Sequence, residues 1–394
     1  MSATTDISQL ALRYGTNPHQ APARVFSPFA LPLGVLNGAP GYINLLDALN
    51  GWQLVRELSS VAGLPAAASF KHVSPAGAAV GVPLPEVVKR ACFVGPEDLS
   101  PLAAAYARAR GADRVSSYGD WVALSDRVDV STARLLRREV SDGVIAPDYE
   151  PAALDILRRK RGGTYTVLRI DPDYRPPEVE RRDVFGLTFE QRRNTFMPDA
   201  EHVGNVVTRR KEVPANALRD MLVALVTLKY TQSNSVCLVL DGQVIGNGAG
   251  QQSRIHCTRL AAAKAETWFL RQHPAVLDLP FRADLERVER DNAIDGFLRD
   301  DLTAAEEGVW LRAFAAPPRR LSADEKRAWL AELRGVTLGS DAFLPFRDNI
   351  DRAHAAGVEY VIQPGGALRE AEIVAACDEY NMLMLTTGVR LFTH

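Results

Sequence analysis

Hydrophobic residues recur along this chain in two patterns, one typical of helices and one typical of short strands. Residues 41–60 carry apolar side chains at roughly helical spacing, among them Leu45, Leu49 and Trp52. This spacing predicts an amphipathic helix packed on a sheet. Residues 215–229 predict a second, strongly helical segment.

Short apolar runs predict the strands. Residues 236–240 and 243–245 flank an Asp-Gly pair, which predicts a hairpin with a type I′ turn. Residues 359–385 predict a strand, a helix and another strand in that order. The alternation of helix and strand patterns predicts an α/β fold.

Two long segments are less regular. Residues 158–195 are rich in Arg, Asp, Glu and Pro without an amphipathic pattern, and we place a domain junction near residue 178. Residues 272–335 predict a polar, helical connecting region without evident chemistry.

The stretch Ser69–Gly77 places a lysine beside a histidine after an apolar run. Neighbouring side chains on a regular strand point to opposite faces, so Lys71 and His72 could not both face one cleft. A turn predicted at residues 74–77, with Pro75 in its second position, would let both side chains converge. An ordinary strand end with a solvated lysine is the alternative.

Composition limits the class of protein. The 394 residues are 46% hydrophobic and 24% charged, which is typical of a globular protein with a buried core, and the length favours two domains or subdomains. The 46 basic and 48 acidic side chains give a formal net charge of −2, so no overall field favours nucleic acid or an acidic membrane. Because no signal-peptide pattern or membrane-spanning run is found, we expect a cytoplasmic protein.

The four cysteines, Cys92, Cys237, Cys257 and Cys377, are scattered without a C-x-x-C pair. This spacing argues against a zinc site and against a dense disulfide framework. We therefore expect free thiols and no metal in the chemistry.

Several loops carry side chains that could bind a ligand. A turn at Asn17–Pro18 leaves Arg13 and Tyr14 on an irregular segment, for which a plain surface loop is the alternative. Asp142 stands at the mouth of a short apolar strand, where the residues alone favour an ordinary Asp-Gly turn. Asn234 precedes the predicted hairpin, where its amide could donate to an oxyanion or form an Asx turn.

Glycine and aromatic residues mark further segments near the C-terminal part. The run 246–250 has the spacing G-x-G-x-G and lacks the acidic residue of a dinucleotide site, so we favour close approach of the backbone to another ligand. Residues 340–349 carry two aromatic rings that could clamp a flat ligand, or could simply join the core.

Together these segments resemble the AICAR transformylase family. That family forms the second half of a bifunctional purine-biosynthesis protein, which also carries IMP cyclohydrolase. The matching blocks include Ser69–Gly77, the segment around Arg13 and the run 229–235, and they extend from Arg13 to His394. Many are several residues long and none is a common motif.

The resemblance implies two substrates, AICAR and 10-formyltetrahydrofolate, the latter as a co-substrate. The expected AICAR-binding residues are Arg13, Tyr14, Gly119, Asp142, Arg254, Phe343, Arg390 and Phe392. The expected folate-binding residues are Tyr118, Ile255, Pro345, Phe346, Asp348, Ala367 and Leu368. Two of these depart from the family pattern, since Tyr118 replaces a usual phenylalanine and Ala367 a frequent serine.

The implied reaction moves the formyl group onto the 5-amino group of AICAR, giving formyl-AICAR and tetrahydrofolate. That amine is a poor nucleophile because the ring and the carboxamide withdraw its electrons, so a base must take its proton. His72 suits this role because histidine ordinarily has a pKa of about 6.5. Lys71 and Asn234 suit the tetrahedral oxyanion, and Arg13 and Arg390 suit the phosphate.

The family also implies an architecture, namely two subdomains related to the cytidine-deaminase fold. Each is an α/β/α layer, with exchanged segments: residues 1–177 plus 272–333 form the first and residues 178–271 plus 334–394 the second. The resemblance further implies an intertwined homodimer with shared active sites. The net charge and the lack of a membrane-spanning run lead us to expect no nucleic-acid or membrane partner.

Two other functions stay open. A zinc nucleoside deaminase would need H-x-E and P-C-x-x-C motifs, and neither is present. A non-catalytic AICAR-binding regulator would keep Arg13 and Arg390 but could lose Lys71 and His72, which are both retained. Because only twelve residues precede Arg13, we expect a stand-alone transformylase that depends on a separate IMP cyclohydrolase.

Overall fold

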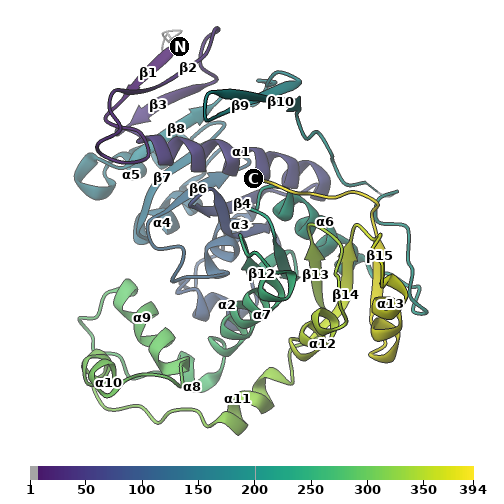
Figure 1. Cartoon of the computed structure of the whole chain (residues 1–394). Coiled ribbons are helices and arrows are strands. Elements are labelled where there is room, and N and C mark those ends of the chain that lie inside the picture. The colour runs from purple at the N-terminus through teal and green to yellow at the C-terminus, as the bar shows by residue number, and fades with distance from the viewer. Residues whose placement is uncertain (1–7, 200) are drawn as a thin grey trace.

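One large mixed sheet runs through the protein and carries helices on both faces (Figure 1). The structure is a computed structural model that describes residues 8–199 and 201–394. Eleven strands form the sheet, in the order β15-β14-β13-β11-β12-β5-β4-β6-β7-β8-β3. The prediction of an α/β fold is confirmed.

The sheet consists of two halves with the same internal arrangement. In each half the first strand of a hairpin pairs antiparallel with a third strand, and two more strands follow in parallel. The first half comprises β4 (Ala66–Lys71), β5 (Ser74–Val80), β6 (Asp120–Leu124), β7 (Ser141–Ala146) and β8 (Thr166–Ile170), with β3 (Leu33–Asn37) added at its edge. The second half comprises β11 (Val236–Leu240), β12 (Gln243–Gly248), β13 (Val336–Ser340), β14 (Val358–Gln363) and β15 (Leu383–Thr386).

The helices occupy matching places in the two halves. The helix before each hairpin, α1 (Tyr42–Ala62) or α6 (Ala215–Lys229), packs on one face of the sheet. The opposite face is covered by α2 (Glu86–Ala91), α3 (Pro101–Gly111), α4 (Val130–Arg138), α5 (Pro151–Arg158), α7 (Arg254–Leu270), α12 (Asp348–Ala355) and α13 (Glu370–Glu379). The helices predicted over residues 41–60 and 215–229, the type I′ hairpin and the strand–helix–strand unit are all confirmed.

The central strands are apolar throughout because helices bury both of their faces. In β4, Ala66, Ala68 and Phe70 join the core under α1 and α6, whereas Ala67 joins the core on the opposite face. Strands buried on both sides read as continuous hydrophobic runs rather than as alternating patterns. None of the helices within residues 8–199 and 201–394 is long and apolar enough to cross a bilayer.

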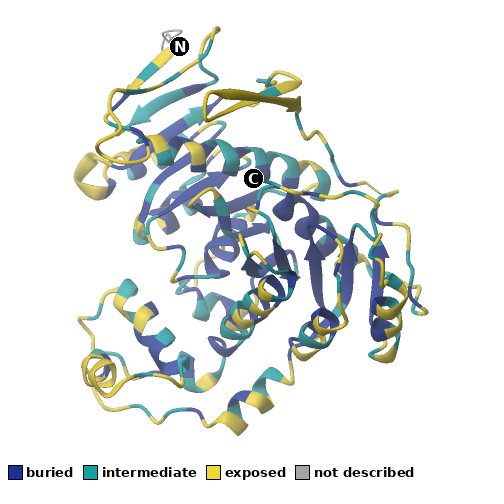
Figure 2. Ribbon diagram, viewed as in Figure 1, coloured by how far each residue is buried: buried dark blue, intermediate teal, exposed yellow. Residues whose placement is uncertain are grey.

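The irregular region predicted at residues 158–195 contains one core strand that the pattern did not indicate. β8 lies there, and its residues Val167, Leu168 and Ile170 are buried in the sheet. A short 3₁₀ helix (Lys160–Gly163) precedes it. The hairpin of β9 (Val179–Val184) and β10 (Leu187–Arg192) then lies outside the main sheet and is almost wholly exposed (Figure 2). A second small antiparallel pair joins β1 (Gln9–Leu12) to β2 (Ala23–Phe26).

The segment predicted as a polar connector builds a small core of its own. It contains α8 (Pro274–Leu277), α9 (Arg287–Leu298), α10 (Ala304–Trp310), a 3₁₀ turn (Leu311–Ala313) and α11 (Ala323–Leu330), and in Figure 1 it extends below the sheet. Phe297 and Trp310 are buried together with six further apolar residues. The domain boundaries at residues 177, 271 and 333 remain predictions.

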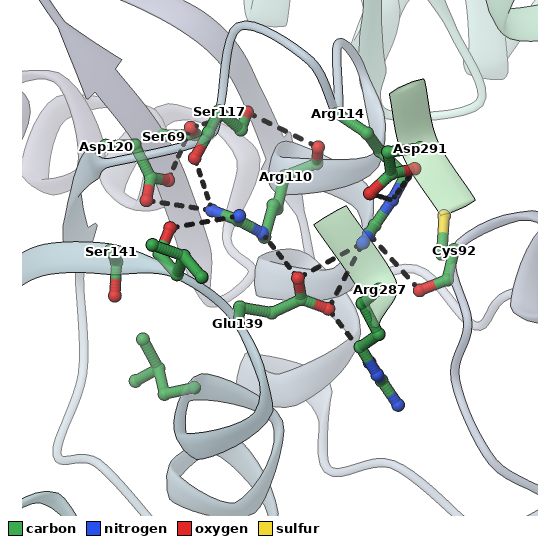
Figure 3. Close-up of polar contacts among 12 residues, drawn as sticks. Ser69, Cys92, Arg110, Arg114, Ser117, Asp120, Glu139, Ser141, Arg287 and Asp291 are labelled. Carbon is green, nitrogen blue, oxygen red and sulfur yellow. Dashed lines mark hydrogen bonds and ion pairs between the residues drawn. The ribbon is translucent and has the colours of Figure 1, made fainter. Parts of the chain in front are cut away.

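A buried network of charges fastens this segment to the first half of the sheet (Figure 3). Glu139, which follows α4, accepts hydrogen bonds from Arg110 at 3.0 Å and from Arg114 at 3.1 Å. It also pairs with Arg287 of α9 at 3.0 Å. Asp291, in the same helix, pairs with Arg114 at 2.9 Å. Because these side chains are largely buried, removing one partner would leave an uncompensated charge.

We predict that Glu139→Gln lowers the free energy of unfolding by about 3–5 kcal/mol at pH 7, the usual scale for breaking a buried ion pair. Burial would raise the pKa of Glu139, but Arg114 and Arg110 outweigh it and lower that pKa from 4.5 to about 2. The stabilisation is therefore present above the ordinary pKa and is lost as the pH falls toward the folded-state pKa. Urea unfolding should show the gap between wild type and variant narrowing below about pH 4.5.

The exposed Glu332 provides a matched control, since Glu332→Gln should change stability by less than about 0.5 kcal/mol. Equal stability of wild type and Glu139→Gln at pH 7 would contradict a stabilising role for the network.

Candidate functional site

The β4–β5 hairpin presents Lys71 and His72 at one edge of the sheet. Lys71 ends β4, and His72 forms a two-residue turn with Val73 before β5 begins. Both turn residues have left-handed backbone angles, with φ of 55° for His72 and 59° for Val73. Such angles are uncommon outside glycine and cost roughly 1–3 kcal/mol each. Strain of this kind persists only where the surrounding structure holds it.

The turn predicted at residues 74–77 is wrong, because these residues already belong to β5. Pro75 lacks an amide donor, but its carbonyl accepts a hydrogen bond from Asn247 at 2.8 Å. Gly77 is needed for packing, since a Cβ there would lie 2.1 Å from the backbone oxygen of Ala109 in α3. Pro75 and Gly77, which are residue types that usually mark turns, therefore lie within a strand, and the chain reverses at His72 and Val73 instead.

A buried carboxylate from α1 holds the turn in place. Asp47 is 5% exposed, and its Oδ1 accepts the Val73 amide at 2.7 Å. Burial raises the pKa of the Asp47 carboxyl above its ordinary value, while the Val73 amide and the His72 imidazole oppose that rise. Among the described residues Asp47 forms no ion pair, so the turn supplies its main polar partner.

The second half of the sheet repeats this arrangement. Asp220 of α6 accepts the amides of Asp241 and Gly242, the turn of the β11–β12 hairpin, at 2.8 and 2.6 Å. Asp47 is not among the site residues predicted from the sequence. The pattern Leu-x-Asp-x-Leu occurs in both helices, at residues 45–49 and 218–222, and could have revealed it.

We predict that Asp47→Ala speeds hydrogen exchange of the Val73 amide by about ten- to hundredfold, because a hydrogen bond to a charged group contributes roughly 1.5–3 kcal/mol. Asp47→Asn keeps an acceptor oxygen and should lose much less protection. The amides of Asp241 and Gly242, held by Asp220, are an internal control and should not change. Unchanged exchange at Val73 in the alanine variant would show that the carboxylate does not hold the turn.

The neighbours of Lys71 include two predicted ligand-binding residues. Its Nζ donates to the carbonyl of Tyr118 at 2.7 Å, and Gly119 follows with a φ of 72° as the chain enters β6. Asp142 lies near the start of β7, which runs parallel to β6, so it belongs to the same edge. Its carboxylate pairs with Arg161 at 3.2 Å.

A second group of predicted residues forms around Arg254. This guanidinium donates to the side-chain oxygen of Asn234 at 3.1 Å and to the buried carboxylate of Asp341 at 2.5 Å. Asp341 also accepts the amide of Ser235 at 3.0 Å. Because a guanidinium can only donate, the Asn234 oxygen must face Arg254. The Asn234 NH₂ group, which has no hydrogen bond within the described part of the chain, remains a free donor.

The two groups meet where the halves of the sheet join. The amide of Gln232 donates to the Ser74 hydroxyl at 3.2 Å, which places the segment before Asn234 beside the strand that follows His72. The C-terminal tail runs alongside this segment. The Ser233 amide donates to the Thr393 carbonyl at 2.9 Å, and the Thr393 amide donates to the Ser233 hydroxyl at 3.0 Å.

The tail residues predicted to bind AICAR lie next to each other. The Arg390 guanidinium is 4.6 Å from the centre of the Phe392 ring, and both side chains are exposed. The carbonyl of His394 accepts a hydrogen bond from Arg182 of β9 at 2.8 Å. The tail therefore lies beside the segment that carries Asn234, with Arg390 and Phe392 exposed within this chain.

Most of the predicted folate-binding residues gather at the ends of β13 and β14. The centre of the Phe346 ring lies 5.8 Å from the guanidinium of Arg369. In the chain, Arg369 directly follows Leu368, which is fully exposed. The remaining members are Ile255 at the start of α7, Pro345, Asp348 and Ala367, and the predicted AICAR-binding residue Phe343 lies two residues before Pro345. The amide of Gly366 donates to the side chain of Glu370, the first residue of α13, at 3.1 Å.

Two predicted residues are not drawn into these groups. Arg13 and Tyr14 follow β1, with the guanidinium 5.7 Å from the ring centre. Among residues 8–199 and 201–394, no hydrogen bond or ion pair joins Arg13 to Lys71, Asn234 or Arg390. Tyr118 contacts Lys71 through its carbonyl, and it is not bonded to the other predicted folate-binding residues around Phe346.

Residues 2–264 match the family model described as the AICARFT/IMPCHase bienzyme. The chain belongs to the AICARFT/IMPCHase family. Two relatives, each a "Bifunctional purine biosynthesis protein PurH" from a strain of Xanthomonas campestris pv. campestris, are 32% identical over 397 residues. The match covers 98% of this chain but only 58% of each relative.

The side chains of this AICARFT/IMPCHase family member offer little to a transition metal. Within the described residues no group of three or more His, Cys, Asp and Glu side chains could hold a metal ion. All four cysteines are buried and unpaired. Burial raises the pKa of the Cys237 thiol well above its ordinary value and that of Cys257 to about 11, so neither is a ready thiolate at neutral pH.

Proposed function

We propose that this chain transfers the formyl group of 10-formyltetrahydrofolate to the 5-amino group of AICAR, giving formyl-AICAR and tetrahydrofolate. The observation that carries the proposal is the strained turn that sets Lys71 and His72 beside the Asn234 group, with the Ser74–Gln232 hydrogen bond joining the two. Family membership supports the same assignment. The strand order repeated in both halves supports the proposed cytidine-deaminase-like subdomains.

His72 is the proposed general base. The AICAR amine attacks the formyl carbon, a C–N bond forms, and His72 takes the amine proton as the tetrahedral intermediate develops. The bond between the formyl carbon and N10 of the folate then breaks, and that proton can pass to N10. An exposed imidazole on a two-residue turn, with its backbone fixed from Asp47, can reach a substrate at this edge.

Lys71 and Asn234 are the proposed donors to the oxyanion of that intermediate. Lys71 carries a positive charge beside the base, and its contact with the Tyr118 carbonyl holds it toward the edge. Arg254 fixes the orientation of the Asn234 amide so that the NH₂ group is the free end. Donors that are already oriented before the reaction stabilise developing charge most effectively.

We predict that His72→Ala lowers kcat for formyl transfer at least about 100-fold, the usual scale for losing a general base. AICAR should still bind, as calorimetry would show, because the proposed phosphate contacts are elsewhere. His354→Ala is the matched control, since His354 stacks on Tyr380 between α12 and α13 at a ring distance of 4.0 Å. Near-normal turnover of the His72 variant would remove it from the role of base.

The formyl-transfer assay also distinguishes the proposed enzyme from a non-catalytic AICAR-binding regulator. A non-catalytic AICAR-binding regulator would bind the nucleotide without any formyl transfer in the wild-type protein. The proposed reaction also requires no metal, so activity should survive treatment with a chelator.

The family name includes a second activity, cyclohydrolase, which we do not assign to this chain. When the purified chain is given formyl-AICAR without folate, we expect no IMP above the uncatalysed background. Formation of IMP in proportion to enzyme would show that this chain closes the ring as well.

A further inference from the structure

The loop between α5 and β8 is a strained segment to which the proposed mechanism gives no role. We refer to residues 159–164 as the β8 loop. Arg161 has a left-handed backbone there, with a φ of 53°, and Gly162 and Gly163 follow with φ of 63° and 93°. Such a conformation is uncommon for an arginine, and it persists only where the surrounding contacts hold it.

Hydrogen bonds on both sides of Arg161 hold the β8 loop in this conformation. The ammonium group of Lys160 is buried, and it donates to the carbonyl of Leu136 and to the hydroxyl of Ser141, both at 3.0 Å. On the other side, the Thr164 hydroxyl donates to the Arg161 carbonyl at 2.8 Å. The position of Arg161 is therefore set by its neighbours, which leaves its own side chain available for another purpose.

The β8 loop brings the Arg161 side chain to Asp142 of β7. Lys160 bonds to Ser141 and Arg161 pairs with Asp142, so two consecutive loop residues contact two consecutive strand residues. In the second pair, Nη1 of Arg161 donates to Oδ1 of Asp142 at 3.2 Å. Within the described part of the chain, Oδ2 of Asp142 accepts no hydrogen bond, so the carboxylate keeps one free acceptor oxygen.

Asp142 lies close to the turn that carries His72. Burial is the main cause of the raised pKa of Asp47, and the charge of Asp142 adds to it, so the two carboxylates are near each other. Asp47 in turn accepts the amide of Val73, the residue after His72. Only β6 separates β7 from β4, the strand that leads into this turn.

This position suits one group of the substrate. Two strand spacings amount to about 10 Å, so Asp142 lies beside the atom on which His72 is proposed to act and does not compete for it. In AICAR the substituent next to the reacting amine is the carboxamide, whose NH₂ group is a donor. The free carboxylate oxygen of Asp142 is a matching acceptor.

We infer that Arg161 is a positioning residue that makes the site selective for the carboxamide of AICAR, acting through Asp142. The inference rests on the proposed function. Arg161 engages Oδ1 of Asp142 and thereby turns Oδ2 toward the substrate, where it accepts an N–H of the amide. A nucleotide that lacks the carboxamide offers nothing for this oxygen to accept, so Arg161 should not affect its binding.

The test compares two nucleotides by calorimetry on the whole chain. One is AICAR, and the other is 5-aminoimidazole ribonucleotide, which has the same ring, amine, ribose and phosphate without the carboxamide. We expect the wild type to bind AICAR at least about tenfold more tightly, the scale of a hydrogen bond to a charged group. Arg161→Gln should weaken AICAR about three- to fivefold, the upper range for one exposed ion pair, and leave the second nucleotide unchanged.

Two further variants serve as controls. Arg161→Lys keeps a charged donor and should recover most of the AICAR affinity. Arg159→Gln removes a charge from the same loop and should change neither affinity, because the exposed Arg159 side chain forms no hydrogen bond or ion pair among the described residues. Equal weakening of both nucleotides by Arg161→Gln would overturn the inference, since the effect would then come from a shared part of the ligand or from the fold.

A double-mutant cycle tests whether Arg161 acts through Asp142. In the Asp142→Asn variant, Arg161→Gln should have no further effect on AICAR affinity, because the ion pair is already lost. Independent, additive effects of the two substitutions would overturn the inference.

Formyl-transfer kinetics separate this inference from the proposed function. If both hold, Arg161→Gln should raise KM for AICAR by a factor similar to its loss of affinity, with a smaller effect on kcat. If the wild type transfers the formyl group but Arg161→Gln leaves KM and both affinities unchanged, the inference is wrong and the function stands. If the wild type shows no formyl transfer but Arg161→Gln weakens AICAR selectively, the positioning role stands and the proposed reaction falls.

Discussion

The contact between β5 and β12 decides where every other part of the site can lie. These two strands join the halves of the sheet through a short antiparallel pairing, in which Gln243 lies opposite Ala79. Gln243 is fully buried, and its amide is satisfied by Arg108 of α3, whose carbonyl accepts at 2.8 Å and whose guanidinium donates at 3.3 Å. A buried amide left without partners would cost about 1–3 kcal/mol, so this pairing fixes the register of the junction.

Because the pairing is antiparallel, the two hairpin turns point in opposite directions. The turn at His72 therefore meets the start of β11 and the end of β12, and the second turn, at Asp241, meets the far end of β5. Both turns are held by an aspartate of the preceding helix, but they present different chemistry. Asp241 engages Arg108 and Arg219 in ion pairs, whereas Lys71 and His72 remain accessible. The second turn thus braces the junction through ion pairs, whereas the first presents accessible polar side chains.

Buried charge has a related role on the opposite side of the first half. Asp120 and Glu139 are held among the guanidinium groups of Arg110 and Arg114, and Asp291 extends the network to α9. Burial alone raises the pKa of Asp120, while Arg110 and the Ser69 hydroxyl oppose that rise. Ser69 lies two residues before Lys71, so β4 connects the network to the turn that carries His72.

The sequence by itself determined the elements whose signals are local. The helices at residues 42–62 and 215–229, the Asp241–Gly242 hairpin and the α/β alternation follow from periodicity and turn chemistry, which depend on residues close together in the chain. The adjacency of Lys71 and His72 was equally plain. Tertiary structure alone decided the rest. The local sequence predicted a turn at Pro75 and Gly77, but both residues lie in a strand that packs against α3. It also predicted an irregular segment where the sheet buries β8. Asp47 became part of the site only when α1 met a hairpin 25 residues further on. Such contacts depend on segments far apart in the chain, and no local pattern records how closely two backbones will approach.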